Sequence, residues 1–171
     1  MTARFRIEAL ADHDRSTFSS GVEALDGYFH KQVTQDIRRR VTACFVAVEQ
    51  DNAQVSEGVA GFYTLAASGL RLSDLPPELA KKLPRYPTVP AVRMGRLAVA
   101  AGWRGQGLGA ALLADAMLRA LSNEIAAFAL VVDAKDDKVA AFYQHHGFIA
   151  FADQPLTLFL PLETAARMLK R

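Results

Sequence analysis

The sequence predicts a mixed α/β domain built on a central sheet. Two observations carry this expectation. From residue 92 onward, strand-like, glycine-rich and helix-like segments alternate in order, and the 171 residues are enough for one hydrophobic core. The composition, 51% hydrophobic and 22% charged, is that of a globular protein rather than a disordered or fibrous one. We therefore expect a single domain over residues 1–171.

The first third predicts a helix followed by a hairpin. A capping-box pattern, Ser20 with Glu23, precedes a helical stripe within residues 20–40. The apolar positions of this stripe should face the core: Val22, Leu25, Phe29, Val33 and Ile37. Residues 42–49 then predict a strand, residues 50–52 a turn, and residues 55–65 the returning strand.

Residues 70–90 predict an ordered insertion over the surface. They hold five of the seven prolines. A short helix is expected over residues 75–82, with Pro76 and Pro77 in its first turn. Surface segments of this kind often carry binding residues.

The second half alternates strands and helices. Asp136 is suited to cap a helix that runs to His146 and stops at Gly147. The other expected elements are a strand at 92–99, a glycine-rich loop at 101–109, a helix at 108–122, a buried strand at 127–133, short strands at 148–151 and 157–160, and a helix at 162–170.

Several classes of protein are excluded. The most apolar helical stretch, residues 107–121, contains Asp115 and Arg119 and is too short to cross a bilayer. The N-terminus lacks the pattern of a signal peptide. The single cysteine, Cys44, excludes an internal disulfide framework and a cysteine-based zinc site. We expect a cytoplasmic protein with no metal site and no membrane partner.

Positive charge is unevenly placed. The net charge is only +2, but residues 70–104 hold seven bases against two acids. Arg38, Arg39 and Arg40 form a second basic cluster. Such clusters are found on solvated faces that keep a protein soluble and also on surfaces that bind polyanions.

The segment Arg104-Gly-Gln-Gly-Leu-Gly109 predicts a phosphate site. Its glycines let the backbone approach a ligand closely, and the helix that follows offers free N–H groups and a positive end. Two common phosphate loops do not fit. A P-loop requires Gly-Lys-Ser/Thr where this chain has Ala110-Ala111, and a dinucleotide fingerprint requires a third glycine where this chain has alanine or leucine.

Two motifs resemble the GCN5-related N-acetyltransferases, the GNAT superfamily. Arg104-x-x-Gly107-x-Gly109 after the strand Gly95-Arg-Leu-Ala-Val99 is similar to the family's motif A, and Ala140-Ala-Phe-Tyr-Gln-His-His-Gly-Phe148 is similar to its motif B. The resemblance implies a twisted, mostly antiparallel sheet that is flanked by helices and splayed between its two central strands. It also implies acetyl-CoA as cofactor, with the pyrophosphate on the loop amides and the pantetheine arm along the preceding strand. The implied cofactor residues are Leu97, Ala98, Val99, Arg104, Gly105, Gln106, Gly107, Leu108, Gly109 and Ala110.

Tyr143 is the predicted catalytic residue. If Val139 and Phe142 face inward, Tyr143 points to the side of its helix, toward the gap between strands. A phenol with a pKa near 10 keeps its proton at neutral pH and can donate it to a departing thiolate. The resemblance implies this role, and plain packing is the alternative.

The resemblance extends to the acetyltransferase toxins of type II toxin–antitoxin pairs. It covers residues 20–26, 61–67, 95–99 and 155–162. It implies acetylation of the α-amino group of an aminoacyl-tRNA, which blocks translation. The implied partners are aminoacyl-tRNA and a ribbon-helix-helix antitoxin, and a homodimer is left open. The basic candidates for tRNA are Arg38, Arg39, Lys81, Lys82, Arg85, Arg93 and Arg96, with Arg96 alternatively a structural hydrogen-bond donor.

Two other functions stay open. An ordinary GNAT enzyme would acetylate a small amine or a protein N-terminus and would have an acidic or neutral acceptor groove. The second alternative is a non-catalytic acetyl-CoA-binding or interaction module, and the retention of both the complete glycine loop and Tyr143 counts against it. No strong base is required for an α-amine with a pKa of about 7.7 to 8.0, and the nearest candidates, Glu124 and Asp133, are not assigned that role.

Overall fold

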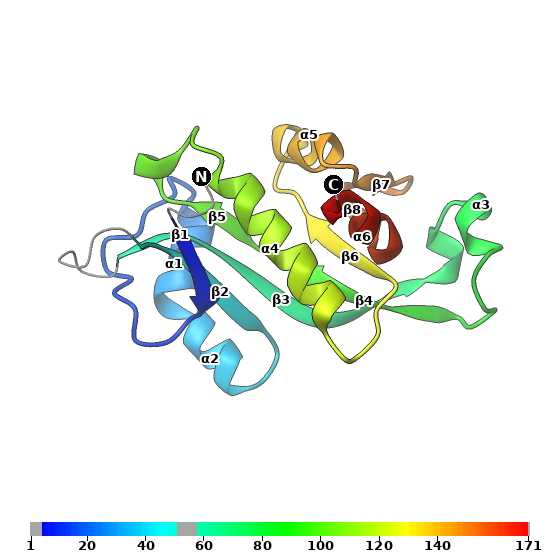
Figure 1. Cartoon of the computed structure of the whole chain (residues 1–171), viewed down its shortest axis with the longest axis horizontal. Helices are drawn as coiled ribbons and strands as arrows, with labels where there is room; N and C mark the ends of the chain where they lie inside the picture. The colour runs from blue at the N-terminus through cyan, green and yellow to red at the C-terminus, as the bar shows by residue number, and fades with distance from the viewer. Residues whose placement is uncertain (1–4, 51–57, 171) are drawn as a thin grey trace. The chain divides into compact units, whose positions relative to one another are not determined.

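The computed structural model describes residues 5–50 and 58–170 (Figure 1). The expected turn at residues 50–52 and the start of the expected strand at residue 55 lie partly or wholly outside this range. The strands are β1 (Phe5–Ala9), β2 (Ala43–Glu49), β3 (Val59–Arg71), β4 (Thr88–Met94), β5 (Leu97–Val99), β6 (Ala129–Asp133), β7 (Ile149–Phe151) and β8 (Gln154–Pro161). The helices are α1 (Glu23–Lys31), α2 (Val33–Arg38), α3 (Pro77–Ala80), α4 (Leu108–Ser122), α5 (Asp137–His145) and α6 (Leu162–Leu169), with 3₁₀ turns η2 (Leu72–Asp74) and η3 (Ala101–Trp103).

The strands follow the order β1-β2-β3-β4-β6-β8-β7, and β5 pairs with β3. The β4–β6 pair is parallel, whereas the pairs β1–β2, β2–β3, β3–β5, β6–β8 and β7–β8 are antiparallel. The mixed, mostly antiparallel sheet with flanking helices confirms the predicted fold class.

The chain divides into two compact units. The described residues up to Ala66 and the segment Arg96–Ala116 form unit 1, and Ala67–Gly95 with the described residues from Met117 form unit 2. Both β3 and α4 continue from one unit into the other.

Unit 1 has an aromatic core. Phe29 of α1 stacks on Phe62 of β3 with ring centroids 4.2 Å apart, and Phe18 meets both rings edge-on. The predicted apolar stripe is confirmed for four residues, because Phe29 and Val33 are fully buried and Leu25 and Ile37 pack against the same cluster.

The predicted capping box is wrong. The N-cap of α1 is Val22, without a side-chain cap. Gly21, at a φ of 87°, turns the chain before the helix. The carboxylate of Asp26 then accepts hydrogen bonds from the backbone N–H and the hydroxyl of Ser20, at 2.9 and 2.7 Å. The single expected helix is also divided in two at Gln32, whose φ is −116°.

Unit 2 places its core on one face of β4, β6 and β8. Buried side chains gather there from β3, the segment after it, these strands and β7: Leu70, Leu75, Val89, Ala91, Ala129, Val131, Phe151 and Phe159. Figure 1 shows α3 at the tip of the long connection between β3 and β4. The expected helix of residues 75–82 is shortened to four residues, with Pro76 as N-cap and Pro77 at its start.

The strand expected over residues 92–99 is interrupted. Gly95 and Arg96 separate β4, which pairs with β6, from β5, which pairs with β3. The sequence also gave no indication of β1, which is held by its pairing with β2. The helix α4 has the predicted bounds, and Asp136 caps α5 by accepting from the N–H of Val139 at 2.9 Å.

Candidate functional site

The glycine loop in unit 1 presents open backbone to solvent. Gly105 and Gly107 have φ angles of 74° and 82°, which β-carbon-bearing residues rarely adopt. A Cβ added at either glycine would meet no described atom within 4 Å. The loop leads directly into the fifteen-residue helix α4. Because the first N–H groups of a helix have no partner within it, this end of α4 can accept an anion.

The N-terminal part of the chain holds the loop in place. The N–H of Ala101 donates to the carbonyl of Ser19 at 2.9 Å, and the Arg104 guanidinium donates to the carbonyl of Ser20. Trp103 packs edge-on against Phe5, with ring centroids 5.0 Å apart. Arg104, a predicted cofactor residue, therefore also anchors the loop.

Strand β5 has one open edge. Leu97, Ala98 and Val99 pair with Tyr63, Phe62 and Gly61 of β3. Among the described strands β5 has no second partner. An extended ligand with amide groups can therefore pair with the open edge as an added strand does.

Helix α4 is fixed close to the sheet at Gly61. A Cβ there would lie 2.9 Å from Leu112 Cδ1 and 3.0 Å from the carbonyl oxygen of Ala98. One turn further along α4, the buried Tyr63 hydroxyl donates to the carboxylate of Asp115 at 2.5 Å. This close packing sets the position of the glycine loop relative to β5.

Tyr143 lies in unit 2 and is only 2% exposed. The inward positions of α5 are Ala140 and Tyr143, whereas Val139 and Phe142 are half-buried, so the expected orientation of this helix is wrong. The reason is that this face of α5 packs on β8, with the Tyr143 ring also lying against Phe148, five residues further on, at a centroid distance of 5.6 Å. Burial, with a smaller contribution from the negative charge of Asp133, raises the pKa of Tyr143 above its usual value.

Asp133 is engaged and not placed to act as a base. Its two carboxylate oxygens accept from Arg93 Nη1 at 2.6 and 2.7 Å, and one of them also accepts from the Thr157 hydroxyl at 3.4 Å. Glu124, the other candidate considered, is exposed in the loop after α4. The guanidinium of Arg93, a predicted tRNA contact, is engaged in this ion pair.

Arg96 is held by an aromatic ring. Its guanidinium carbon lies 3.4 Å from the centroid of Tyr28, and its backbone N–H donates to the Thr64 hydroxyl at 3.2 Å. The Tyr28 hydroxyl donates to Asp36 at 2.8 Å, and burial together with this hydrogen bond raises the pKa of Tyr28 to about 12. The side chain of Arg96 thus has a structural role as a cation–π partner.

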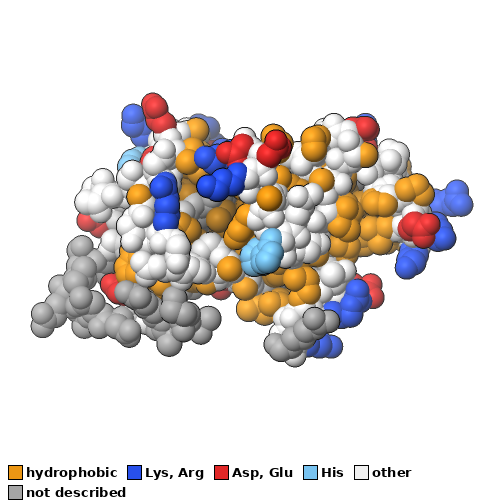
Figure 2. Space-filling model, turned by 90° about the horizontal axis from the view of Figure 1, so that it is seen from above, with side chains coloured by type: hydrophobic (Ala, Val, Ile, Leu, Met, Phe, Trp, Pro, Cys, Tyr) orange, Lys and Arg blue, Asp and Glu red, His pale blue; other side chains and the backbone are white. Residues whose placement is uncertain are grey.

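The remaining basic candidates are exposed on two segments. Arg38 and Arg39 lie at the end of α2 in unit 1, and Lys81, Lys82 and Arg85 follow α3 in unit 2. In Figure 2, Lys and Arg side chains gather at the right-hand end of the view, over the segment that Figure 1 labels α3. Tyr86, which the sequence analysis did not single out, is 66% exposed beside Arg85. An aromatic residue within a basic run was the signal that could have indicated it.

The described part of the chain gives no support for a reactive cysteine, a metal site or a membrane-spanning helix. Cys44 is buried, and burial raises the pKa of its thiol to about 12, which leaves it unreactive. No group of three or more potential metal ligands occurs among residues 5–50 and 58–170. None of the helices described is long and apolar enough to cross a membrane.

An open glycine loop at a helix start, next to a strand with a free edge, is able to bind a phosphate-bearing ligand that carries an extended amide arm. Residues 41–150 match the family model described as the acetyltransferase (GNAT) domain, and the chain belongs to this family of N-acetyltransferases. The predicted family and class of enzyme are confirmed.

A curated relative and three solved structures resemble nearly the whole chain. The "tRNA-acetylating toxin" of Mycobacterium tuberculosis (strain ATCC 25618 / H37Rv) is 32% identical over 158 residues, 91% of this chain and 90% of the relative. A crystal structure of a tyrosine-to-phenylalanine mutant of KacT has a TM-score of 0.88 and 29% identity, covering 96% of this chain and 99% of the other.

Two of the similar solved structures are of AtaT with other molecules bound. AtaT complexed with acetyl-methionyl-tRNAfMet has a TM-score of 0.85 and 29% identity, covering 96% of this chain and 99% of the other. A tyrosine-to-phenylalanine mutant of AtaT, bound to the C-terminus of the antitoxin AtaR and acetyl-CoA, has a TM-score of 0.80 and 26% identity, covering 98% and 99%.

Proposed function

We propose that this chain transfers the acetyl group of acetyl-CoA to the α-amino group of an aminoacyl-tRNA and so acts as a toxin that blocks translation. The observation that carries the proposal is the similarity, along nine-tenths of both chains, to a tRNA-acetylating toxin. The retained Tyr143 supports catalysis over a binding-only role, because the open glycine loop would be needed to bind acetyl-CoA in either case.

The residues of unit 1 fit acetyl-CoA. The left-handed glycines Gly105 and Gly107 leave open space where a Cβ would stand, as a pyrophosphate cradle requires. The N–H groups of Leu108, Gly109 and Ala110 lie in the first turn of α4, Arg104 begins the loop, and Gln106 lies between its two left-handed glycines. Leu97, Ala98 and Val99 offer the open edge of β5 to the pantetheine amides. When bound, acetyl-CoA supplies an activated acetyl thioester and a thiol leaving group.

Tyr143 holds the proton that the reaction needs. Because burial raises its pKa, its hydroxyl stays protonated throughout the neutral range and serves as a general acid at Oη. The α-amine of an aminoacyl ester loses its own proton near neutral pH, so the chain needs no strong base. The engagement of Asp133 with Arg93 is consistent with that absence.

The exposed bases are the proposed tRNA contacts. Lys81, Lys82 and Arg85 after α3, and Arg38 and Arg39 at the end of α2, can reach phosphates because their side chains are exposed. Arg93 is held by Asp133, and Arg96 is held by Tyr28. We therefore assign these two arginines to positioning the residues around them and not to binding tRNA.

The proposed setting is the bacterial cytoplasm, with a ribbon-helix-helix antitoxin as partner. A structure of the related AtaT with an antitoxin segment and acetyl-CoA supports this partner. Translation and charged tRNA are cytoplasmic, which supports the location. A homodimer remains a prediction.

The test is acetyl transfer from labelled acetyl-CoA to total charged tRNA, with uncharged tRNA as the control substrate. We expect label only on charged tRNA, and a loss of about a hundredfold or more in kcat for Tyr143→Phe. Tyr86→Phe is the matched control, since it removes a hydroxyl from an exposed ring.

Each other outcome has a definite meaning. Label that is unaffected by Tyr143→Phe would keep the substrate and remove Tyr143 as the acid. Binding of acetyl-CoA without transfer to any charged tRNA would overturn the toxin proposal and leave an enzyme for a small amine or a protein N-terminus.

A further inference from the structure

The part of α4 that belongs to unit 1 is apolar except at one position. Leu108, Leu112, Leu113 and Ala116 are buried there. From Leu108 to Ala116, Asp115 is the only residue with a polar side chain, and it is half-buried. A half-buried carboxylate loses part of its hydration, which costs free energy unless a partner compensates it.

A partner of Asp115 is Tyr63 of β3. The Tyr63 hydroxyl donates to the carboxylate at 2.5 Å, the length of a charge-assisted hydrogen bond. The Tyr63 ring is fully buried and stacks on Phe45 with ring centroids 5.3 Å apart, which fixes the direction of its hydroxyl. Apolar contacts are non-directional and let a helix slide along a sheet, whereas a hydrogen bond weakens steeply when its geometry changes. This hydrogen bond therefore fixes α4 along β3.

Tyr63 also holds the strand that carries the other half of the acetyl-CoA site. It pairs with Leu97 of β5. At the next position, the Thr64 N–H donates to the Arg96 carbonyl at 3.0 Å, and the Arg96 N–H donates to the Thr64 hydroxyl at 3.2 Å. Asp115 lies about two turns along α4 from the glycine loop. Tyr63 thus joins the strand proposed for the pantetheine arm to the helix proposed for the pyrophosphate.

We propose that the hydrogen bond between Tyr63 and Asp115 holds the two halves of the acetyl-CoA site at the spacing that the cofactor requires. Neither residue is among the proposed cofactor residues, so the two act as positioning residues. The inference rests on the proposed function only for its cofactor, and a failure of transfer to charged tRNA would leave it standing. If α4 shifts along β3, each half of the site still binds its own part of the cofactor, but one molecule no longer fits both halves.

The first test compares acetyl-CoA with ADP, which carries a pyrophosphate but no pantetheine arm. Tyr63→Phe removes the hydroxyl and keeps the ring that stacks on Phe45. We expect the Kd for acetyl-CoA, measured by isothermal titration calorimetry, to rise about tenfold, and the Kd for ADP to change by less than about twofold. The matched control is Tyr28→Phe, which loses a hydroxyl-to-carboxylate hydrogen bond to Asp36 elsewhere in unit 1 and should change neither Kd.

The outcomes separate positioning from plain stabilisation. Equal weakening of acetyl-CoA and ADP binding would show that the hydrogen bond only stabilises the glycine loop, and would overturn the inference. An unchanged Kd for acetyl-CoA in a folded Tyr63→Phe, or no binding of acetyl-CoA to the wild type, would overturn it as well.

The second test changes the acceptor of the hydrogen bond. Asp115→Asn keeps a carbonyl oxygen for the Tyr63 hydroxyl and should bind acetyl-CoA within about threefold of wild type, whereas Asp115→Ala should weaken binding about tenfold. Because Tyr63→Phe and Asp115→Ala remove the same hydrogen bond, the double variant should bind acetyl-CoA about as tightly as either single variant. Losses that multiply in the double variant, or an Asp115→Asn that binds as weakly as Asp115→Ala, would contradict the proposal.

Discussion

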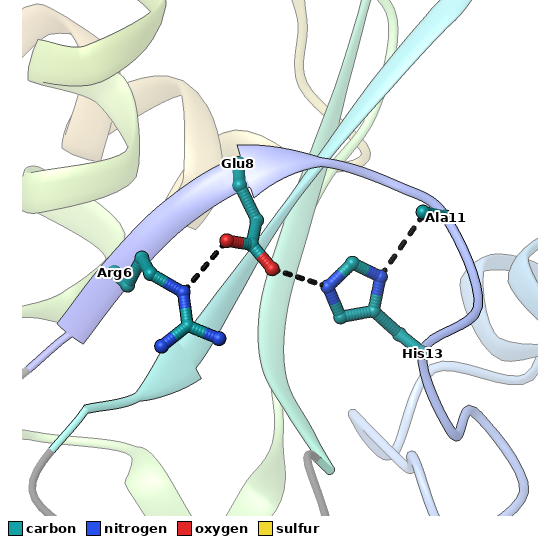
Figure 3. Close-up of polar contacts among 4 residues, drawn as sticks. All are labelled: Arg6, Glu8, Ala11 and His13. Carbon is teal, nitrogen blue, oxygen red and sulfur yellow. Dashed lines mark hydrogen bonds and ion pairs between the residues drawn. The ribbon is translucent and has the colours of Figure 1, made fainter.

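Glu8, near the end of β1 in unit 1, lies between two basic side chains (Figure 3). Its carboxylate accepts from Arg6 Nε and from His13 Nε2, both at 2.6 Å. The N–H of Ala11 donates to His13 Nδ1 at 3.0 Å. Because Nδ1 accepts that bond, the ring proton is on Nε2, which donates to Glu8.

This arrangement makes the free energy of unfolding depend on pH in the acidic range. The hydrogen bonds from Arg6 and then His13 lower the pKa of Glu8 below its usual value. A carboxyl with a lowered pKa stabilises the fold above its unfolded pKa, and the stabilisation is lost as pH falls through the folded value. We expect Glu8→Gln to unfold at lower urea than wild type at neutral pH, and the two to converge below about pH 4.

Urea midpoints at neutral pH and at about pH 3.5 measure this prediction. Glu124→Gln, at an exposed position, is the control and should change neither midpoint. A gap between wild type and Glu8→Gln that is the same at both pH values would show that Glu8 acts through packing instead of its charge.

At the scale of elements, two glycines with opposite surroundings test how α4 is positioned. Gly61→Ala forces a Cβ to 2.9 Å from Leu112 Cδ1 and 3.0 Å from the Ala98 carbonyl, and should destabilise the fold by about 1–3 kcal/mol. Gly27→Ala, in α1 with no described atom within 4 Å of the new Cβ, should stabilise it by about 0.5–1 kcal/mol. Thermal or urea unfolding of both variants measures these changes in the free energy of unfolding. An unchanged free energy of unfolding for Gly61→Ala would mean that α4 can move away from β3.

The segment after α3 belongs to the same scale. It is anchored by Leu83, and the preceding helix by Leu79 and Ala80, all of which pack against the core of unit 2, while the charged residues of the segment remain exposed. Replacing Lys81, Lys82 and Arg85 together by alanine should weaken tRNA binding and reduce the slope of log K against log salt by about two to three, because each phosphate contact contributes about 0.7–0.9.

Filter binding or anisotropy across a salt series measures that slope. Arg167→Ala, which removes an exposed base from α6, is the control. Tyr86→Ala should weaken binding further with little change in slope, and Tyr86→Phe should not, since stacking requires the ring alone. A triple variant with an unchanged slope would remove this segment from the tRNA surface.

At the scale of the whole molecule, the two units are not independent stretches of chain. The sequence enters unit 2 at Ala67, returns to unit 1 at Arg96 and enters unit 2 again at Met117. The continuous elements β3 and α4 carry two of these crossings. We therefore expect one cooperative unfolding transition, as a single domain requires, with equal calorimetric and van't Hoff enthalpies. Two resolved transitions in scanning calorimetry would instead define two domains.

The sequence alone determined the structural features that depend only on residues close together in the chain. The bounds of α4, the Asp136 cap of α5 and the glycine loop follow from local patterns of capping, periodicity and backbone freedom. The two acetyltransferase motifs are short and continuous, so the family and its proposed cofactor residues could be predicted from them.

The tertiary structure decided the features that depend on contacts between residues far apart in the chain. It interrupted the strand of residues 92–99, because β4 pairs with β6 and β5 pairs with β3. It turned the Tyr143 face of α5 toward β8, joined Arg93 to Asp133 across forty residues, and built a cavity in unit 2 from three separated segments. Local propensity cannot specify such contacts, because their free energy comes from burial and pairing that exist only once the distant segments have met.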